Sequence, residues 1–532
     1  MSDSQYSFQD INIPENIEKS FSEFLIDKQI QFPNLSNKIL EEWNFEKYLD
    51  KNGILPLNLE QFPTLIDSIP NLSNVKESDN NQLKLIKFYG TIQNVFENQL
   101  YISAKYDSQN KKYLPNKFFE NNSNVIKIED DNLGNKSGVD ILGDRLRLEL
   151  VPVIGINEYF DKKYDLNIDN IKKIIVYDYT NKYTKINQNI LVIGVAYEKN
   201  DTIIIHCWKI IENYEKMKIC KDSYSLINIT ENKNIYREKL KNILLKSVKN
   251  DQLTTEYLLL FLFSQIFAKI GAKNIGSFPL NLILDESNDI SKCNDIYSNI
   301  LNIFRKFCCK AKDIKLTTDE LNNKLFYPRF DGEIEELCPG KLQLSDGTFL
   351  LVDEINMNEG KLIDIGVKNV AALKSLIDFQ LLGYEYPYNK IEISHDIEVL
   401  ILSYKAKSIL YSPFLTLLPM MPVNDNNGDN ESYVLSENDF KNIFYYINFI
   451  RYDSSFNDKF AISNEISNSI QKNYFEINPK FKADDFDLVL KLSRFHALSY
   501  GRNFMTYEDY EYVVYLENQR KERLNNYNNK KK

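Results

Sequence analysis

The run T-F-L-L-V-D-E, residues 348–354, places two adjacent carboxylates, Asp353 and Glu354, directly after four apolar residues. Carboxylates at the carboxyl edge of a buried strand can hold a magnesium ion and polarise an attacking water, as in a nucleotide hydrolase. This is the local pattern of a Walker B motif. An apolar strand that leaves the core through an acidic turn has the same pattern, so these two residues alone do not establish the chemistry.

A hydrolase of that kind also needs a phosphate loop, G-x-x-x-x-G-K-[ST], whose main-chain N–H groups and lysine hold the phosphates. The chain contains no such string. The nearest spacing, G-A-K-N-I-G-S-F from Gly271, has Ser277 where the lysine is needed and precedes its strand instead of following it. A helix cap followed by a turn is the interpretation that this string favours.

The expected place for a phosphate loop, after the strand predicted to end at Leu284, reads D-E-S-N-D-I-S-K. Each carboxylate about 4 Å from a phosphate charge repels it by about 1 to 4 kcal/mol, depending on the local dielectric. The single lysine there does not offset three carboxylates, and the stretch 404–430 contains no arginine to act as an arginine finger. We therefore expect no catalytic residue, no cofactor and no metal ion, with Asp353 and Glu354 as a Walker-B-like remnant. The three carboxylates at the expected place of the phosphate loop are Asp285, Glu286 and Asp289, and the lysine is Lys292.

Composition narrows the other functional classes. The formal net charge of −10 and a sequence pI near 5.2 argue against a surface that binds nucleic acid mainly by neutralising phosphates. Six cysteines without a C-x-x-C pair, and only three histidines, indicate neither a disulfide framework nor a zinc site. His206, His395 and His496 are expected to be satisfied or exposed rather than catalytic.

The N-terminal sequence has neither a basic nor an apolar segment typical of a secretory signal, so none is expected. The most apolar run, from Tyr257, is shorter than the roughly 20 residues that a bilayer requires. It predicts a buried helix with Gly271 as its C-cap.

The chain predicts a mixed α and β fold of several domains. Residues 1–80 predict a helical, variable region, and residues 81–215 predict short period-two strands that form a small barrel, most simply an OB-like barrel, with a mobile insert near 107–136. In residues 232–423, strands alternate with helices, which is typical of a parallel α/β sheet. Residues 435–525 predict helices, and residues 526–532 predict a disordered tail.

Two segments resemble the minichromosome maintenance (MCM) helicase subunits. The run L-C-P-G-K-L-Q-L-S-D-G-T-F-L-L-V-D-E-I-N-M-N, from Leu337, resembles their Walker B neighbourhood. The run K-L-S-R-F-H-A-L-S-Y-G-R-N-F-M-T-Y-E-D-Y-E-Y-V-V-Y-L, from Lys491, resembles the helical lid that closes their ATPase domains. Along that lid pattern, the position of the arginine that touches the γ phosphate falls on Asp484, which reverses the charge.

The chain is more similar still to the mini-chromosome maintenance complex-binding protein family, a divergent relative and partner of the helicase subunits. The resemblance covers roughly residues 40 to 525, and its most specific part is L-V-D-E-I-N-M-N-E-G-K-L-I-D-I-G-V-K-N-V-A-A-L, residues 351–373. Other matching pieces are L-I-K-F-Y-G-T-I-Q-N-V-F from Leu85, V-P-V-I-G from Val151, T-T-E-Y-L-L-L-F-L-F from Thr254, G-S-F-P-L-N-L from Gly276, F-Y-P-R-F-D-G from Phe326 and L-E-N-Q-R-K-E-R-L from Leu516.

The resemblance implies an OB-like barrel, a degenerate AAA+-like α/β domain over residues 232–423 and a C-terminal helical lid over residues 435–525. It also implies a non-catalytic protein that binds MCM subunits in the nucleus and governs assembly or chromatin release of the complex during DNA replication. Links to sister-chromatid cohesion, mitosis and cell division come with the family. Chromatin association is then indirect, without a membrane and without direct nucleic-acid binding.

Two alternatives stay open. One is a nucleotide-binding AAA+ protein with a non-standard phosphate loop. The other is a binder of single-stranded DNA through the barrel, with aromatic side chains that stack on bases and lysines on the backbone. The residues for that role are Phe88, Tyr89, Phe96, Tyr101, Lys84 and Lys87. The basic residues in 520–523 and 530–532 predict a solvated helix end and tail, with a nuclear localisation signal as the alternative.

Overall fold

The computed structural model describes residues 19–21, 23–24, 84–107, 112–115, 140–157, 159–160, 173–179, 185–199, 202–220, 223–271, 273–284, 290–404, 408–422, 436–477 and 483–530. The chain divides into two compact units. The first consists of Met1–Val153 with Lys163–Met217, and the second of Ile154–Lys162 with Lys218–Lys532. Nearly all of the predicted N-terminal helical region, and most of the predicted insert near 107–136, lie outside the described residues.

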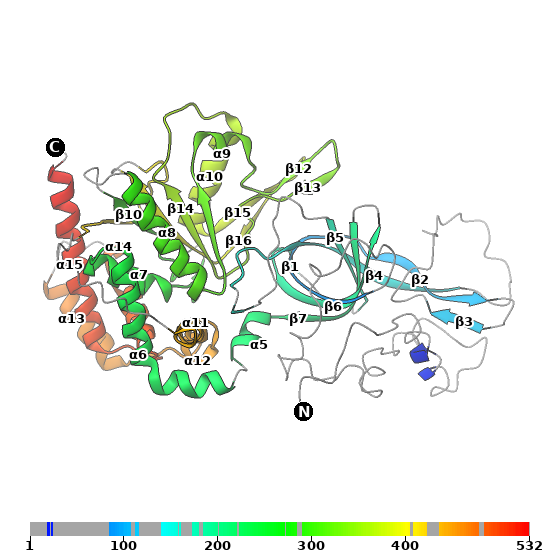
Figure 1. Ribbon diagram of the computed structural model, residues 1–532, viewed down its shortest axis with the longest axis horizontal. Helices are drawn as coiled ribbons and strands as arrows, with labels where there is room; N and C mark the ends of the chain where they lie inside the picture. The colour runs from blue at the N-terminus through cyan, green and yellow to red at the C-terminus, as the bar shows by residue number, and fades with distance from the viewer. Residues whose placement is uncertain are drawn as a thin grey trace. The chain divides into compact units, whose positions relative to one another are not determined.

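The first unit contains a closed barrel (Figure 1). Its strands pair in the order β1-β6-β7-β5-β4, and β4 pairs again with β1, which closes the sheet. All of these pairs are antiparallel except β5 with β7, while β2 and β3 extend the sheet beyond β4. The strands are β1 (Lys84–Val95), β2 (Gln99–Asp107), β3 (Lys112–Pro115), β4 (Ile141–Pro152), β5 (Lys173–Asp178), β6 (Asn189–Lys199) and β7 (Thr202–Glu212). They are followed by α5 (Tyr214–Cys220).

The barrel core explains why this sequence forms strands. Alternate side chains of a strand point to opposite faces, so a period-two apolar pattern supplies one buried face. The residues that fill the interior are mostly β-branched or aromatic and are fully buried, among them Phe88, Ile92, Leu148, Val176 and Val192. The strand-rich region that the sequence predicts after residue 81 is therefore present where the structure describes it.

The second unit contains a five-stranded sheet in the order β11-β14-β17-β10-β18, with every pair parallel. The alternation of strands with helices predicted such a sheet, because parallel strands need long crossover connections. The carboxyl ends of all five strands meet at one edge. The strands are β10 (Leu280–Leu284), β11 (Ala311–Lys315), β14 (Thr348–Glu354), β17 (Ile397–Tyr404) and β18 (Thr416–Pro419), and α8 (Ile290–Phe307), α9 (Thr318–Asn323) and α10 (Asp364–Phe379) lie between them in sequence.

A smaller sheet in the same unit has the order β13-β12-β15-β16. Its strands are β12 (Arg329–Asp331), β13 (Glu336–Cys338), β15 (Leu381–Glu385) and β16 (Lys390–Ser394). A separate hairpin pairs β8 (Ala268–Ile270) with β9 (Lys273–Ile275).

The predicted helix from Tyr257 to Gly271 is wrong at its C-terminal end. The helix α7 (Gln252–Leu262) stops at Leu262, and the residues after it form the β8–β9 hairpin. Gly271 lies in the turn of that hairpin at φ 60°, a left-handed conformation that glycine adopts without a steric penalty. The polar residues that follow the apolar run therefore form strand and turn, not a further helical turn.

Helices α6 (Ser223–Ser247), α11 (Glu437–Tyr452), α12 (Ser454–Asn457), α13 (Asn464–Ile477), α14 (Ala483–Ser499) and α15 (Tyr507–Lys530) complete the second unit. Together with α7 and α8 they share one apolar core with the parallel sheet. The last helix continues to Lys530, although a disordered tail is predicted from the sequence for residues 526–532. The ring of Tyr527 is buried, which gives the final turns of α15 a packing contact that composition alone does not reveal.

Ion pairs fix α15 to the rest of the unit. Arg523 Nη1 lies 2.7 and 2.9 Å from the two carboxylate oxygens of Asp251, the residue that caps the N-terminus of α7. Arg520 binds Glu517 on the same helix at 2.7 Å and donates to the Leu417 carbonyl at 3.1 Å. Glu517 in turn accepts a hydrogen bond from the hydroxyl of Tyr257 on α7. Arg520 and Arg523 are thus internal clamps, and the prediction that they form a solvated helix end is wrong.

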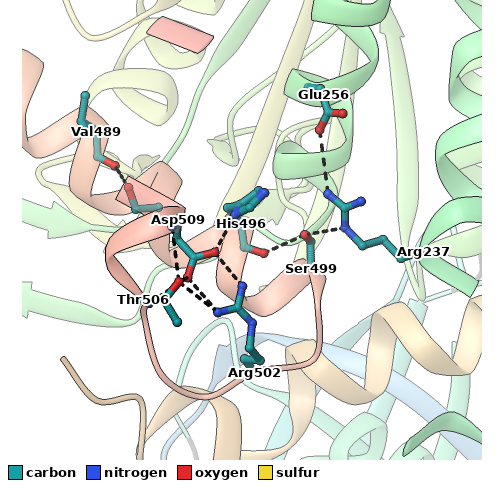
Figure 2. A network of polar contacts seen from close by, with 9 residues as sticks. Arg237, Glu256, Val489, His496, Ser499, Arg502, Thr506 and Asp509 are labelled. Carbon is teal, nitrogen blue, oxygen red and sulfur yellow. Dashed lines mark hydrogen bonds and ion pairs between the residues drawn. The ribbon is translucent and has the colours of Figure 1, made fainter. Parts of the chain in front are cut away.

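A second network joins α14 to the start of α15 (Figure 2). The carboxylate of Asp509 receives hydrogen bonds from His496 Nδ1 at 2.7 Å, from Arg502 at 2.7 and 3.0 Å, and from the Thr506 N–H at 2.8 Å. Burial opposes ionisation of Asp509, but these hydrogen bonds outweigh it and hold the pKa at about 2. At the other end of the network, Arg237 of α6 donates to the Ser499 hydroxyl at 3.1 Å.

Replacement of Arg523 by Met is expected to lower the free energy of unfolding by about 3 kcal/mol, because it leaves the Asp251 carboxylate buried without its cation. Lys521, two residues earlier on the same helix, is the matched control. Its partner Asp485 is one-third exposed, so Lys521→Met should change the free energy by less than about 1 kcal/mol. Urea unfolding monitored by circular dichroism measures the free energy of unfolding of both variants. An equal decrease in the two variants would refute the stabilising role of the Arg523–Asp251 ion pair.

The Asp509 network predicts a specific pH dependence. The folded pKa of about 2 lies below the ordinary value of 3.8, so the carboxylate contributes stability that is fully present above pH 4 and is lost as pH falls through 2. Asp509→Asn should therefore lower the free energy of unfolding by about 2 kcal/mol at pH 7, and the deficit should shrink between pH 4 and pH 2. Asp458→Asn, at an exposed site, is the control. A deficit that stays constant with pH would contradict the assignment.

Candidate functional site

Asp353 and Glu354 are the last two residues of β14, at the carboxyl edge of the parallel sheet. The register places Lys315 of β11 beside Asp353, and Ser403 of β17 beside Glu354. Ligands of open α/β sheets bind at this edge. The position predicted for the two carboxylates from the sequence is therefore correct.

Asp353 is nearly inaccessible, with 2% of its surface exposed. Its Oδ1 accepts a hydrogen bond from the N–H of Ile355 at 3.0 Å, and its Oδ2 lies 3.4 Å from the side-chain nitrogen of Asn356. The same nitrogen donates to Asn294 on α8 at 2.9 Å. Burial raises the pKa of Asp353, while these hydrogen bonds act in the opposite direction. The carboxylate thus stabilises the turn that ends β14.

Glu354 faces a different part of the chain. Its Oε1 accepts a hydrogen bond at 2.6 Å from the N–H of Ile409, in the connection between β17 and β18. Burial raises the pKa of Glu354, and hydrogen bonds from Ser408 and Ile409 partly offset this. Because successive side chains of a strand point to opposite faces, Asp353 and Glu354 diverge. The structure does not direct them at one shared ion.

The glycine-rich segment from Gly271 does not form a phosphate loop in its described residues. Gly271 and Gly276 flank the second strand of the β8–β9 hairpin, so the turn predicted for this string is correct and the helix cap is wrong. A side chain at Gly276, which has φ 111°, would lie 2.1 Å from the Gln265 carbonyl oxygen. Asp285, Glu286 and Asp289 lie outside the described residues, and Lys292 is exposed on the first turn of α8.

Other predicted site positions are only partly described. The connection after β17 holds no arginine in its described part, residues 408–422. Asp484 lies in α14, but its side chain is outside the described part of the chain. Over the described ranges, no group of three or more His, Cys, Asp or Glu side chains is placed to hold a metal ion. Across the same ranges, no helix has both the length and the hydrophobicity needed to span a membrane.

The barrel aromatics proposed for base stacking are mostly internal. Phe88, Tyr89 and Tyr101 are at most 7% exposed. Phe96 is half-buried, with the Arg147 guanidinium 4.4 Å from its ring centroid. Lys87 is buried as well, and the side chain of Lys84 is outside the described residues. The strand alternation that could have revealed this burial is visible in the sequence.

The three histidines are buried, and each is surrounded by other residues of the chain. His206 Nδ1 lies 2.6 Å from the Tyr179 hydroxyl, and burial lowers its pKa to about 3. Burial also lowers the pKa of His395, whereas His496 is paired with Asp509. All six cysteines are free thiols.

One charged cluster was not singled out from the sequence. Lys368 of α10, Glu385 of β15 and Lys390 of β16 line a cavity of about 180 Å³, together with small residues of the helix and strand. The hairpin signal L-G-Y-E-Y-P-Y-N-K-I-E-I-S, residues 382–394, was available in the sequence. The sequence does not reveal that this hairpin packs against α10, because that contact depends on the tertiary fold.

Comparison with known proteins identifies the family of this chain. The sequence model of the mini-chromosome maintenance replisome factor family matches residues 200–524, more than half of the chain. The mini-chromosome maintenance complex-binding protein of Arabidopsis thaliana is 28% identical over 291 residues, 54% of this chain and 47% of that protein. The proteins of the same name from Gallus gallus and Homo sapiens are 29% identical over 301 residues and 26% identical over 322 residues.

The chicken alignment covers 54% of this chain and 45% of the relative, and the human alignment covers 59% and 48%. The chain thus spans about half the length of the curated relatives it matches. The matched residues include the parallel sheet, β14 with its two carboxylates, and the helices α14 and most of α15. The chain belongs to the mini-chromosome maintenance replisome factor family.

Proposed function

We propose that this chain is a non-catalytic binding protein whose partners are MCM helicase subunits. The family match over residues 200–524 carries this proposal. The curated relatives bear the name of mini-chromosome maintenance complex-binding proteins, and the residues matched by the family include the whole parallel sheet.

The absence of catalysis is supported by what the two candidate carboxylates do. Asp353 accepts from the N–H of Ile355, and Glu354 accepts from the N–H of Ile409. Asp353 therefore stabilises the turn that follows β14, and Glu354 stabilises the connection between β17 and β18. The two side chains lie on opposite faces of β14. We propose that the second unit is a pseudo-ATPase that has kept an AAA+-like sheet as a scaffold and lost the phosphate loop.

The fold of each of the two units, taken by itself, supports the proposal. A closed barrel with order β1-β6-β7-β5-β4, with one parallel pair, is consistent with an OB-like fold. A parallel sheet with helices and a C-terminal group of helices is consistent with an AAA+-like core and its lid. We infer that the chain is a divergent relative of the helicase subunits and occupies a subunit's place against them.

In this proposal the protein acts in the nucleus. It regulates assembly of the MCM complex or its release from chromatin during DNA replication, and it is thereby linked to sister-chromatid cohesion, mitosis and the cell cycle. Association with chromatin is indirect, through the MCM subunits.

One observation favours a second function, nucleotide binding with a non-standard loop. Glu354 Oε2 is buried and has no hydrogen-bond partner among the described residues, at the sheet edge where ligands bind. Titration calorimetry with magnesium and ATP on the purified chain tests this alternative. Binding with magnesium-dependent hydrolysis would replace the non-catalytic proposal. Single-stranded DNA binding through the barrel is not favoured, because its candidate aromatics are mostly buried.

The partner is tested by capture. The tagged full chain is incubated with nuclear extract at low salt, and the bound proteins are identified by mass spectrometry. Recovery of MCM subunits is the expected result. An eluate without any MCM subunit would overturn the proposed function.

Asp353→Asn and Glu354→Gln test the non-catalytic proposal within that assay. Each variant keeps an oxygen that accepts the same main-chain N–H, so capture should change by less than about twofold and stability by less than about 1.5 kcal/mol. Thermal unfolding of each variant separates loss of folding from loss of function. A sharp loss of capture with an unchanged melting temperature would mean that the carboxylates act in the function directly.

A further inference from the structure

Three charged residues form a row across the smaller sheet. The register pairs Arg329 of β12 with Glu385 of β15, and Glu385 with Lys390 of β16. Paired residues share one face of a sheet, so the row has the charge order plus, minus, plus. Lys368 of α10 adds a cation above Glu385, with its Nζ 2.7 Å from Oε1.

The row carries more positive than negative charge. Lys368 and Arg329 act on the carboxylate of Glu385, and Lys390, its register partner, forms an ion pair with Glu392. The hydrogen bond from Lys368 holds the pKa of Glu385 below its ordinary value, and the charge of Arg329 lowers it further. Arg329, Lys368 and Lys390 against Glu385 and Glu392 leave one positive charge in excess, in a chain whose net charge is −10.

Lys390 is available for a further contact. Among the described residues it forms an ion pair with Glu392 at 3.4 Å, and the two side chains are 62% and 53% exposed, so that pair contributes little. The Lys390 side chain lies over Gly383, where an added Cβ would be 2.1 Å from its Cε atom. Ala371 and Ala372 of α10 line the same cavity. Small residues thus leave the lysine room to move.

The outer edge of β16 has main-chain groups directed away from the sheet. The bonds from His395 N–H to the Gln380 carbonyl, and from Tyr386 N–H to the Asn389 carbonyl, fix the alternation of the hairpin. By that alternation Ile391 and Ile393 bond to β15. Lys390, Glu392 and Ser394 therefore present their N–H and C=O groups at the opposite edge, where no other described strand pairs.

We propose that the edge of β16 binds an extended acidic segment of a protein partner as an added strand, with a carboxylate of that segment opposite Lys390. The added carboxylate continues the row as plus, minus, plus, minus. Main-chain groups of Lys390, Glu392 and Ser394 pair with the segment, which a nucleic acid would not do. An apolar residue next to the carboxylate packs on Ile391, which is 41% exposed. The identity of the partner as an MCM subunit rests on the proposed function.

The first experiment uses a probe peptide, fluorescein-labelled Val-Thr-Val-Glu-Val-Thr-Val, and a comparator with Lys in place of Glu. Fluorescence anisotropy with the full chain should show tighter binding of the Glu peptide by about tenfold, weakening with salt. Lys390→Glu should reverse the preference. Failure of the wild-type chain to bind the Glu peptide, or an unchanged preference in Lys390→Glu, overturns the inference. Displacement of the peptide by a single-stranded oligonucleotide from a Lys390-dependent site would also overturn it.

The second experiment repeats the capture of MCM subunits with variants. Lys390→Glu and Glu392→Pro, which removes an outward N–H, should each lower capture by about tenfold, whereas the exposed control Lys459→Glu should not. Melting temperatures near that of the wild type show that the hairpin is folded. Full capture by both variants overturns the inference and leaves the proposed function standing. No capture by the wild-type chain overturns the proposed function, and the peptide experiment still decides the strand-addition site.

Discussion

The carboxylate of Asp251 holds the second unit together. It caps α7 through the N–H and hydroxyl of Thr254, accepts a hydrogen bond from the N–H of Met421 after β18, and pairs with Arg523 on α15. One buried group therefore joins a helix near the middle of the chain, the last strand of the parallel sheet and the last helix. A buried carboxylate is costly unless its lone pairs are satisfied, and here several donors satisfy it.

The same physical constraint explains the surroundings of the two candidate carboxylates. Asp353 Oδ1 and Glu354 Oε1 each accept a hydrogen bond from a main-chain N–H group, whereas Glu354 Oε2 has no partner among the described residues. Their adjacency on β14 sends them to opposite faces of the sheet. The carboxyl edge thus uses acidic side chains to terminate a strand and to hold a loop, which is a structural role for a pattern typical of hydrolases.

The sequence was sufficient for features that depend on local periodicity. Apolar runs bounded by polar turns predicted β10, β14 and β17, and the intervening amphipathic segments predicted the helices that separate them. It was insufficient where a partner lies far along the chain. Arg523 meets Asp251 across 272 positions, so a basic helix end looked solvated when it is a clamp. The end of α7 was misplaced because apolar composition does not distinguish a helix from a buried turn and hairpin.

Where the charges are satisfied determines where the molecule can still bind. Glu517, Asp509 and Asp251 have cationic partners within the unit, so their charges are not available to another molecule. At the β12–β15–β16 row, by contrast, Arg329 and Lys368 act on the carboxylate of Glu385, and the outermost cation, Lys390, lies on an edge strand in an exposed pair with Glu392. An unpaired strand edge is a liability that proteins commonly protect with charged residues such as lysine. At β16 that protective lysine is also the group that selects an acidic strand, so protection and recognition depend on the same side chain.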